Sequence, residues 1–310
     1  PVPESQTPTH FGGKSGRNFG PLNFWQFDDT RLTWGDRTYL MGVLNLTPDS
    51  FSDGGQFNSL ATAIAQADRL AAEGADIIDL GGQSTRPGAA TVSIDEELDR
   101  VIPVIHLIRE GGYGYPPLTT PLSIDTTRAT VAREAIVAGV DLVNDISGAT
   151  ADDRMLATVA ELAVPIVLMH RRGTPQTMQT LTDYDDVVRE VVTWLGDRVA
   201  AAEAAGLPPQ AIAIDPGLGF AKTASQNLDI LRRLREFRGL NRPLLVGPSR
   251  KSFIGEILQE TDPKKRIWGT GAACAAAIAG GADLLRVHDL QAMRDVARVT
   301  DAIYRVGQPT

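Results

Sequence analysis

The sequence predicts a (β/α)8 barrel in a single domain, preceded by a short irregular arm. Eight short apolar stretches recur along the chain, each flanked by Gly, Pro, Asp or Asn, as expected of strands buried on both faces. Segments with apolar residues at helical spacing lie between them. Strand followed by helix, repeated over about 270 residues, is the pattern of this barrel. An open, doubly wound sheet is the alternative, because the number of strands does not prove closure.

The predicted strands are the apolar stretches themselves, and most of them end in a small or chemically reactive residue. They cover residues 38–46, 76–81, 121–125, 142–145, 165–170, 211–215, 243–247 and 284–288. The predicted helices cover residues 59–74, 93–110, 127–138, 152–162, 183–205, 225–237, 264–279 and 291–305. Capping residues support these bounds, because Ser93 and the acidic residues after it are typical of a helix start and Gly74 of a helix end.

Composition narrows the class of protein. The 310 residues are 43 % apolar and carry a formal net charge of −8, which argues against non-specific binding to nucleic acid. No apolar run approaches the roughly 20 residues of a membrane span, so no membrane partner is expected. Residues 1–25 are rich in Gly, Ser, Thr and Pro and lack the apolar core of a signal peptide. We expect an irregular arm there and one domain over residues 26–310.

The single cysteine, Cys274, stands in an alanine-rich run and predicts a packing residue in a helix. One cysteine cannot form an intramolecular disulfide, which fits a reducing compartment, and we expect a cytoplasmic protein. No spacing of His, Cys and Asp predicts a structural zinc site.

Acids and an amide end several predicted strands, at the end of a barrel where active sites lie. Asp125 ends the third strand, Asn144 and Asp145 end the fourth, and Asp215 ends the sixth. Buried carboxylates are costly without partners. Three acids on one rim therefore predict a ligand with N–H donors or positive charge, although each acid alone could accept a bond from a nearby loop amide.

Basic residues follow the last two strands. The segments 247–253 and 286–289 supply Arg250, Lys251, Arg286 and His288. Barrels often bind phosphate at these two loops. Arg286 and His288 alternate with apolar residues, so both should point to one face of the strand. A phosphate-binding corner is the prediction for this part of the rim.

Two further loops are suited to the same rim. Residues 45–55 form a polar loop that ends in paired glycines, as a mobile lid requires. Residues 81–88 offer hydroxyls, accessible backbone N–H groups and one arginine, which suit an oxyanion. His170, after the fifth strand, is either a ligand contact or a structural histidine. The residues alone thus predict a barrel enzyme with a phosphate corner and acids placed for a nitrogen-rich ligand.

Seven of these segments together resemble the motifs of the dihydropteroate synthase family, in order and across nearly the whole barrel. They are 45–55 (NLTPDSFSDGG), 79–88 (DLGGQSTRPG), 123–126 (SIDT), 143–148 (VNDISG), 215–222 (DPGLGFAK), 247–255 (GPSRKSFIG) and 286–289 (RVHD). The resemblance implies an enzyme of folate biosynthesis. It would join (7,8-dihydropterin-6-yl)methyl diphosphate to para-aminobenzoate, giving 7,8-dihydropteroate and diphosphate, with Mg2+ as cofactor.

The resemblance also implies which residues hold the pterin. Asp125, Asn144, Asp215 and Lys251 would bind its hydrogen-bonding edge, and Met169 would pack against its ring. Such pairing is selective, because a wrong ligand leaves buried polar groups unpaired.

The diphosphate and metal site implied by the family lies at the basic corner. Arg286 and His288 would grip the diphosphate, with Thr85 beside it, and Asn45 would contact the diphosphate or its Mg2+. One protein ligand is reasonable for Mg2+, which usually keeps waters beside phosphate oxygens.

The para-aminobenzoate site would be formed by Phe51, Arg86, Pro87, Phe220 and Ser252. Ser252 could take the carboxylate at a helix N-terminus. The implied catalytic residues are Asp125, Lys251 and Arg86, acting by positioning and charge stabilisation rather than as a strong base.

Two positions depart from the family pattern, and two alternative functions remain. Gln83 stands where the family commonly has Glu, and the loop 170–175 carries Arg171 and Arg172, which either add positive potential to the cleft or face solvent. The alternatives are another pterin-binding barrel, such as a methyltetrahydrofolate methyltransferase, and a catalytically silent paralogue. The resemblance further implies a homodimer.

Overall fold

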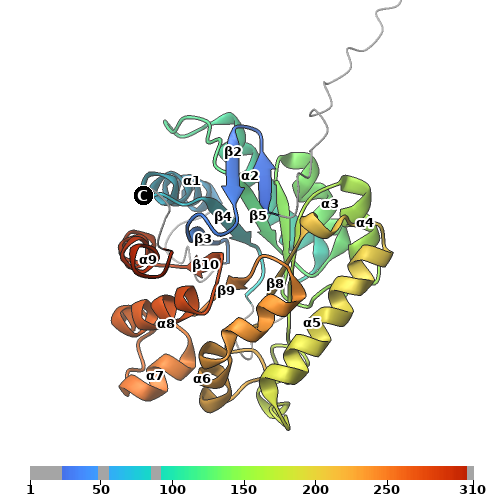
Figure 1. The fold of residues 1–310 in the computed structure, drawn as a ribbon. Helices are drawn as coiled ribbons and strands as arrows, with labels where there is room; N and C mark the ends of the chain where they lie inside the picture. The colour runs from blue at the N-terminus through green and yellow to red at the C-terminus, as the bar shows by residue number, and fades with distance from the viewer. Residues whose placement is uncertain (1–22, 48–55, 85–91, 306–310) are drawn as a thin grey trace, which may run out of the picture.

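Eight parallel strands form a barrel at the centre of the molecule, and the helices surround it (Figure 1). The computed structural model describes residues 23–47, 56–84 and 92–305. The barrel strands are β3 (Tyr39–Asn45), β4 (Ile77–Gly81), β5 (Leu122–Asp125), β6 (Leu142–Asp145), β7 (Ile166–Met169), β8 (Ile212–Asp215), β9 (Leu245–Val246) and β10 (Leu284–Val287). Their order in the sheet is β8-β7-β6-β5-β4-β3-β10-β9.

The two edges of this sheet meet and close the barrel. Ile214 of β8 and Leu244, next to β9, form a parallel bridge, and the Ile214 N–H donates to the carbonyl oxygen of Pro243 at 2.9 Å. Because the edge strands pair with each other, the predicted barrel is confirmed and the alternative open sheet is wrong.

The predicted helices are confirmed, with their ends shifted by a few residues. They are α1 (Gln56–Ala72), α2 (Ile94–Glu110), α3 (Ala129–Ala138), α4 (Met155–Leu162), α5 (Val187–Ala204), α6 (Ala224–Arg232), α8 (Ile267–Ala279) and α9 (Leu290–Tyr304). A 3-10 helix over Leu234–Leu240 follows α6, so that predicted helix changes character before its end. One more helix, α7 (Ser252–Leu258), is not among the predicted helices, although a helix N-terminus was expected at Ser252. It is a short extra helix after the seventh barrel strand, where barrels often build phosphate sites.

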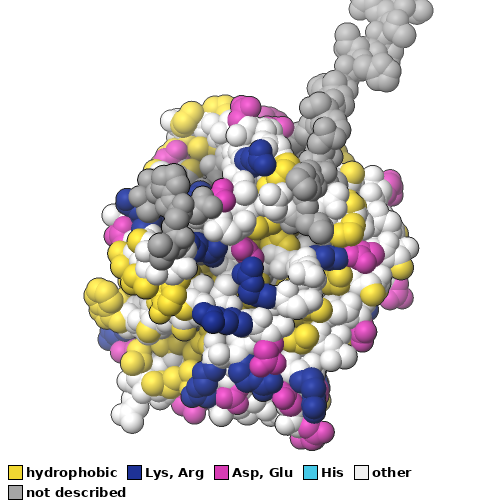
Figure 2. Space-filling model, in the orientation of Figure 1, with side chains coloured by type: hydrophobic (Ala, Val, Ile, Leu, Met, Phe, Trp, Pro, Cys, Tyr) yellow, Lys and Arg dark blue, Asp and Glu magenta, His cyan; other side chains and the backbone are white. Residues whose placement is uncertain are grey.

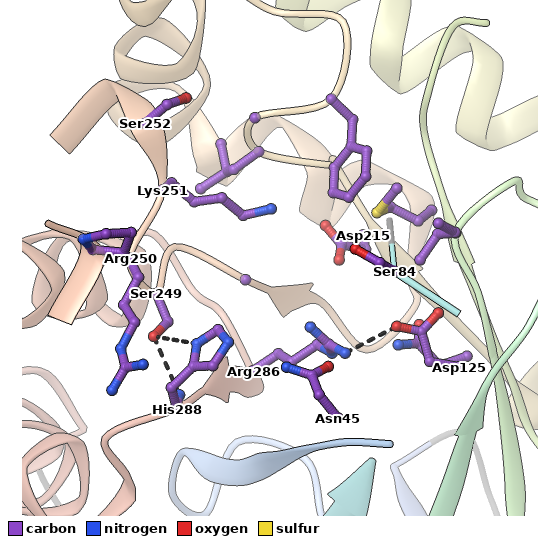
Figure 3. A pocket seen from close by; sticks show the side chains of 18 of the residues that line it. Asn45, Ser84, Asp125, Asp215, Ser249, Arg250, Lys251, Ser252, Arg286 and His288 are labelled. Carbon is purple, nitrogen blue, oxygen red and sulfur yellow. Dashed lines mark hydrogen bonds and ion pairs between the residues drawn. The ribbon is translucent and has the colours of Figure 1, made fainter. Parts of the chain in front are cut away.

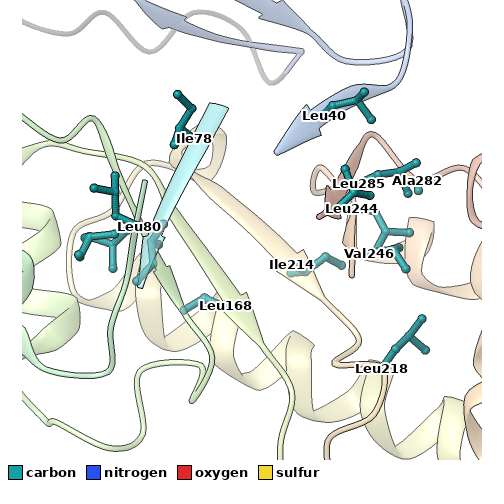
Figure 4. Packing of buried hydrophobic residues seen from close by; sticks show 14 of the residues in the cluster. Leu40, Ile78, Leu80, Leu168, Ile214, Leu218, Leu244, Val246, Ala282 and Leu285 are labelled. Atoms are coloured by element: carbon teal, nitrogen blue, oxygen red, sulfur yellow. The ribbon is translucent and has the colours of Figure 1, made fainter. Parts of the chain in front are cut away.

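Side chains alternate between the two faces of each barrel strand, which divides the core into two layers. Outward residues such as Leu40, Ile78 and Leu168 pack against the helices in a large cluster (Figure 4). Inward residues near the strand starts, such as Met41 and Ile77, form a second cluster inside the barrel. The interior of the barrel is therefore packed with apolar side chains at its amino-terminal end, and the polar residues of the cleft lie at its carboxyl end.

An antiparallel hairpin that was not predicted covers the amino-terminal end of the barrel. It consists of β1 (Phe24–Phe27) and β2 (Thr30–Thr33). Trp25 and Leu32 join the cluster inside the barrel, and the Trp25 indole N–H donates to the Gln210 carbonyl oxygen at 2.8 Å. The predicted boundary between arm and domain at residues 25 and 26 falls inside β1. Most of the predicted arm lies outside the described residues.

The outer surface has one feature that bears on assembly. Large apolar side chains are exposed on α7, α8 and α9, and hydrophobic residues gather over these helices in Figure 2. They are Ile257, Leu258, Trp268, Val299, Ile303 and Tyr304.

Cys274 of α8 is buried, as predicted. Within the described ranges, no helix has the length and hydropathy that crossing a bilayer requires.

Candidate active site

A cleft of about 550 Å3 opens at the carboxyl ends of the strands (Figure 3). It brings together the predicted site residues Asn45, Asp125, Asn144, Met169, Asp215, Phe220, Lys251, Ser252, Arg286 and His288. The remaining predicted residues, Phe51, Thr85, Arg86 and Pro87, lie outside the described residues. Predicted residues from seven of the eight strand ends thus share one space.

Strand register sets the order of these side chains around the rim. Asp125 of β5 pairs in register with Asn144 of β6, and Met169 of β7 pairs with Asp215 of β8. Each of the four ends its strand or stands next to its end. Because neighbouring strands in a barrel lie close together, the register alone places two acids, an amide and a thioether side by side.

Arg286 crosses the floor of the cleft and binds two carboxylates. Its Nε donates to Asp79 Oδ2 at 2.6 Å, and its Nη2 donates to Asp125 Oδ2 at 2.9 Å. The Asn144 amide also donates to Asp79 Oδ2, at 3.1 Å. Among the described residues, nothing donates to Asp125 Oδ1, although this atom is buried. A buried acceptor in this state is prepared for a donor on a ligand.

The loop after β8 is held by a buried lysine. Lys222 donates to the carbonyl oxygens of Gly217 at 3.0 Å and Phe220 at 2.9 Å, and it lies 3.0 Å from His170 Nδ1. Gly217 has a φ of +70°, and a Cβ there would lie 2.0 Å from the His170 carbonyl oxygen. Only glycine fits that turn. Its N–H donates to Asp215 Oδ1 at 2.7 Å and so fixes this carboxylate.

His170 is a structural residue in this arrangement. Its ring is buried, lies edge-on to Trp194 with a centroid separation of 4.9 Å, and does not line the cleft. Burial and the neighbouring Lys222 lower the pKa of His170 to about 2, so its neutral ring accepts a hydrogen bond from Lys222. Of the two roles that the sequence left open for His170, the structure supports a structural histidine rather than a ligand contact.

Lys251 enters the cleft from the start of α7. In Figure 3 its ammonium group is directed toward Asp215. The Lys251 Nζ lies 4.3 Å from the centre of the Phe220 ring, and a Cβ at Gly219 would be 3.0 Å from Lys251 Cδ. The close backbone approach at Gly219 lets the lysine lie between the ring and the acids.

The basic corner differs in detail from the expectation. His288 Nδ1 lies 2.9 Å from Ser249 Oγ, and this hydroxyl accepts the backbone N–H of His288 at 3.2 Å. When the hydroxyl donates a hydrogen bond to Nδ1, the neutral ring carries its N–H on Nε2. Arg250 is bound to both oxygens of Asp289, at 3.0 and 2.6 Å. It therefore shapes the corner, while Arg286 and His288 face the cleft as predicted.

Burial shifts several pKa values in the cleft in the direction that favours the uncharged form of each group. Burial raises the pKa of Asp125 to about 7, while Arg286 opposes and Asp79 adds to this shift. Burial likewise raises the pKa of Asp215 to about 6 and lowers that of Lys251 to about 8. The pKa of His288 falls to about 3, because it is buried and Arg286 and Arg250 lie near it. Such concentrated shifts are typical of functional sites.

The two departures from the family pattern are resolved in part. Gln83 lines the cleft, so the missing charge lies at the site itself. Arg172 donates to Glu190 at 2.7 Å and lies over the Tyr184 ring, away from the cleft. Arg171 is partly buried and attracts Asp145 and Asp125. One of the two arginines therefore adds positive potential near the acids, and the other does not.

Sequence reasoning missed two residues that organise the site. Asp79 lies in the segment 79–88, but no role was predicted for it, because it stands in the middle of a strand rather than at its end. Lys222 lies in the segment 215–222, and no role was predicted for it either. The available signal for Asp79 was its spacing of two from Ile77, which places both on the inner face of β4.

Known proteins with similar sequences and folds agree with this geometry. Residues 41–288 match the pterin-binding enzyme family. A dihydropteroate synthase of Synechocystis sp. is 58 % identical over 276 residues, covering 89 % of this chain and 93 % of that protein.

Two solved structures share the fold and name ligands. The dihydropteroate synthase of Clostridium difficile, crystallised in the presence of pteroic acid, is 45 % identical with a TM-score of 0.82, covering 88 % of this chain and 98 % of that one. The dihydropteroate synthase of Xanthomonas albilineans with 4-aminobenzoic acid is 43 % identical with a TM-score of 0.82, covering 89 % and 96 %. The chain therefore belongs to the pterin-binding enzyme family and, within it, to the dihydropteroate synthases, which are transferases of folate synthesis.

Proposed function

We propose that this chain joins (7,8-dihydropterin-6-yl)methyl diphosphate to para-aminobenzoate, giving 7,8-dihydropteroate and diphosphate. The observation that carries the proposal is the division of one cleft into two halves of opposite character. Buried acids stand on one side, with Asp125 Oδ1 lacking a donor in the described part of the chain, and Arg286 and His288 stand on the other. A pterin diphosphate has donors at one end and negative charge at the other.

The pterin end would be held by the acids and their neighbours. Its amino and ring N–H groups would donate to Asp125 and Asp215, and its carbonyl would accept from Lys251. Asn144 lies beside Asp125 in register and would complete the hydrogen-bonding edge, while Met169 would pack on the ring. The near-neutral pKa values of Asp125 and Asp215 allow both to be ionised once donors surround them.

The diphosphate would bind at the corner formed by Arg286 and His288, with Thr85 as a predicted further contact. Ser249 supports this assignment, because a hydrogen bond from its hydroxyl to His288 Nδ1 would leave the Nε2 N–H for the ligand. An anion between these groups would also offset the charge repulsion that now lowers the pKa of His288.

A magnesium ion fits this corner as a shared rather than a protein-only site. Among the described residues, no group of three or more His, Cys, Asp or Glu side chains could hold a metal alone. Asn45 ends β3, lines the cleft and offers an amide oxygen, the kind of ligand that Mg2+ accepts beside phosphate oxygens. We propose Asn45 as the protein ligand. The ion, when bound, would neutralise charge on the diphosphate.

Para-aminobenzoate would enter beside Phe220 and Ser252. Both line the cleft, and Ser252 is the first residue of α7. Phe51, Arg86 and Pro87 would complete this pocket according to the family pattern. The Phe220 ring also covers Lys251, which would bring the arylamine next to the pterin.

The proposed chemistry is a substitution at the methylene carbon of the pterin. The bond from this carbon to the diphosphate oxygen breaks, and its electron pair leaves with the diphosphate toward Arg286 and His288. The arylamine nitrogen forms the new bond to the carbon and releases a proton to solvent. Asp125 would stabilise the delocalised pterin cation between these steps, and Lys251 and Arg86 would position the two substrates.

We further propose a homodimer through the exposed apolar side chains of α7, α8 and α9. Trp268 is 86 % exposed, and Val299 and Ile303 are also largely exposed. A cluster of this kind on a surface marks an interaction site. These helices lie on the outside of the barrel, so the cleft stays accessible.

The lone buried Cys274 is in keeping with a reducing compartment, and we place the enzyme in the cytoplasm.

Turnover tests the proposed function. Purified protein is mixed with the pterin diphosphate, para-aminobenzoate and Mg2+, and both dihydropteroate and diphosphate are measured. We expect equal amounts of the two products, and none when any one component is left out. Tight binding of the pterin diphosphate without products would favour a silent paralogue. Transfer of a methyl group from methyltetrahydrofolate would favour the methyltransferase alternative.

A further inference from the structure

Asp79 lies beneath the cleft and touches two of the groups assigned to the substrate. It stands in the middle of β4, has no exposed surface, and faces Ser123 of β5 in register. Its Oδ2 accepts from Arg286 Nε at 2.6 Å and from the Asn144 amide at 3.1 Å. Arg286 belongs to the diphosphate corner and Asn144 to the pterin edge. One buried oxygen thus links the two halves of the site.

We propose that Asp79 is a positioning residue for the proposed reaction, fixing Arg286 and Asn144 relative to each other from below. The inference rests on the proposed function, because it assigns these two residues to the substrate. Asp79 itself does not line the cleft, so it acts through its partners rather than on the ligand.

The geometry explains why a second carboxylate is needed. In the ligand-free arrangement Asp125 binds one arm of Arg286, at 2.9 Å. A pterin that donates to Asp125 would compete for this carboxylate and release that arm. The bond from Asp79 to Nε, nearer the backbone, would then keep the guanidinium in the corner. An arginine held in advance loses less rotamer entropy when it binds an anion.

The stability of the fold does not by itself explain why a carboxylate stands at position 79. A buried ion pair contributes little net stability, because desolvation offsets the attraction between the charges. Within the described residues, Asp79 Oδ1 is buried without a hydrogen-bond partner, which adds a further cost. Replacing the whole buried ion pair by apolar side chains of similar volume is often neutral or stabilising. The charge at this position therefore serves the site.

Asp79 also acts electrostatically on Asp125, which gives a readout that a purely structural residue would not change. The groups that face Asp125 are Arg286 from β10, Asp79 from β4, Glu97 from α2 and Asp145 from β6, with Arg171 and Lys251 from the loops. Asp79 and the other acids raise the pKa of Asp125. Removing the charge of Asp79 therefore moves the pKa of Asp125 downward.

The test compares Asp79→Asn with wild type, using Asp76→Asn as the matched control. Asp76 precedes the same strand and binds Arg37 at the far end of the barrel. These two residues form an aspartate–arginine pair that lies away from the cleft. The measurements are kcat and KM for both substrates, calorimetric affinity for inorganic diphosphate with Mg2+, and the pH profile of kcat/KM.

For Asp79→Asn we expect kcat to fall roughly tenfold to a hundredfold, as when an outer partner that orients a functional group is lost. Diphosphate should bind more weakly, the KM for para-aminobenzoate should stay unchanged, and the acid limb of the pH profile should move to lower pH. Asp76→Asn should lower only the melting temperature. A variant Asp79→Asn with wild-type kcat, diphosphate affinity and pH limb would overturn the proposal.

A second variant keeps the test decisive if Asp79→Asn does not fold. Asp79→Glu keeps the charge and moves the carboxylate by one methylene, so kcat should fall while the pH limb stays in place. If neither variant folds, Asp79 is a folding residue and the proposal fails. If wild type makes no dihydropteroate, the proposed function fails, whereas the calorimetric comparison still reports on how Asp79 holds Arg286.

Discussion

Residue by residue, the alternation along each strand determines which groups reach the cleft. On the inner face, apolar side chains at the strand starts give way to polar ones two residues later. Ile77 is followed by Asp79, and Leu142 is followed by Asn144. The apolar positions exclude water from below, and burial raises the pKa values of Asp125 and Asp215 at the same end of the barrel. Packing and reactivity are thus set by the same short runs of sequence.

The pKa of Asp125 predicts how activity depends on pH. Burial raises this pKa to about 7, so the carboxylate form is lost as pH falls through that value. A protonated Asp125 carries no charge to stabilise the cation, and kcat/KM should fall with it. In Asp125→Asn the decrease of kcat/KM near pH 7 should vanish, which leaves the titration of Asp215 near 6 and that of the substrate. The ratio of kcat/KM in wild type to that in Asp125→Asn, measured against pH, isolates the titration of Asp125. A ratio that does not change with pH would contradict the role assigned to Asp125.

Single residues were predictable where they stand at a strand end, and less so elsewhere. Asp125, Asn144 and Asp215 follow apolar runs directly, so the general rule for barrels located them. Asp79 and Arg286 are 207 residues apart, and no local pattern announces that they form a pair. They meet because β4 and β10 lie on either side of β3 in the sheet, so the proposed role of Asp79 required the structure.

For the helices and strands, length decides what can be read from a sequence. The long helices and the buried strands have clear periodicity and were predicted within a few residues. The hairpin of β1 and β2 has four residues in each strand, and α7 has seven. Such short elements show too few periods to stand out, and tertiary packing stabilises them.

The hairpin should support stability without affecting chemistry. Trp25 is almost fully buried at the amino-terminal end of the barrel, and the cleft lies at the other end. We expect Trp25→Ala to lower the free energy of unfolding by about 3–5 kcal/mol, the usual cost of removing a buried aromatic side chain. Phe24→Ala, on the other face of the same strand, should cost less. Urea unfolding measures both, and an altered kcat in either folded variant would argue against this separation.

On the scale of the whole molecule, closure of the sheet and the exposed helices define two separate surfaces. The cleft collects residues from nearly every barrel strand, whereas the apolar patch lies on α7, α8 and α9. Gly271 of α8 lies against Val296 of α9, where a Cβ would be 3.3 Å from Val296 Cγ2. This close packing holds the two helices as one platform for the proposed dimer.

The proposed dimer can be separated from activity. Trp268→Glu together with Ile303→Glu places two charges in the patch, and we expect it to convert a dimer into a monomer in sedimentation experiments at micromolar concentration. Val137→Glu is the control, because Val137 is an exposed apolar residue on α3, outside the patch. A monomeric wild type, or a double variant that remains dimeric, would show that the patch is not the interface.

The most direct test of the account compares dihydropteroate formation by wild type and Asp125→Ala, with melting temperatures recorded for both. Because we assign the charge that stabilises the pterin cation to Asp125, we expect product from wild type and a loss of at least about a hundredfold in the folded variant, the scale of one lost electrostatic contact to a transition state. Equal rates in the two proteins, or no product from wild type, would contradict it.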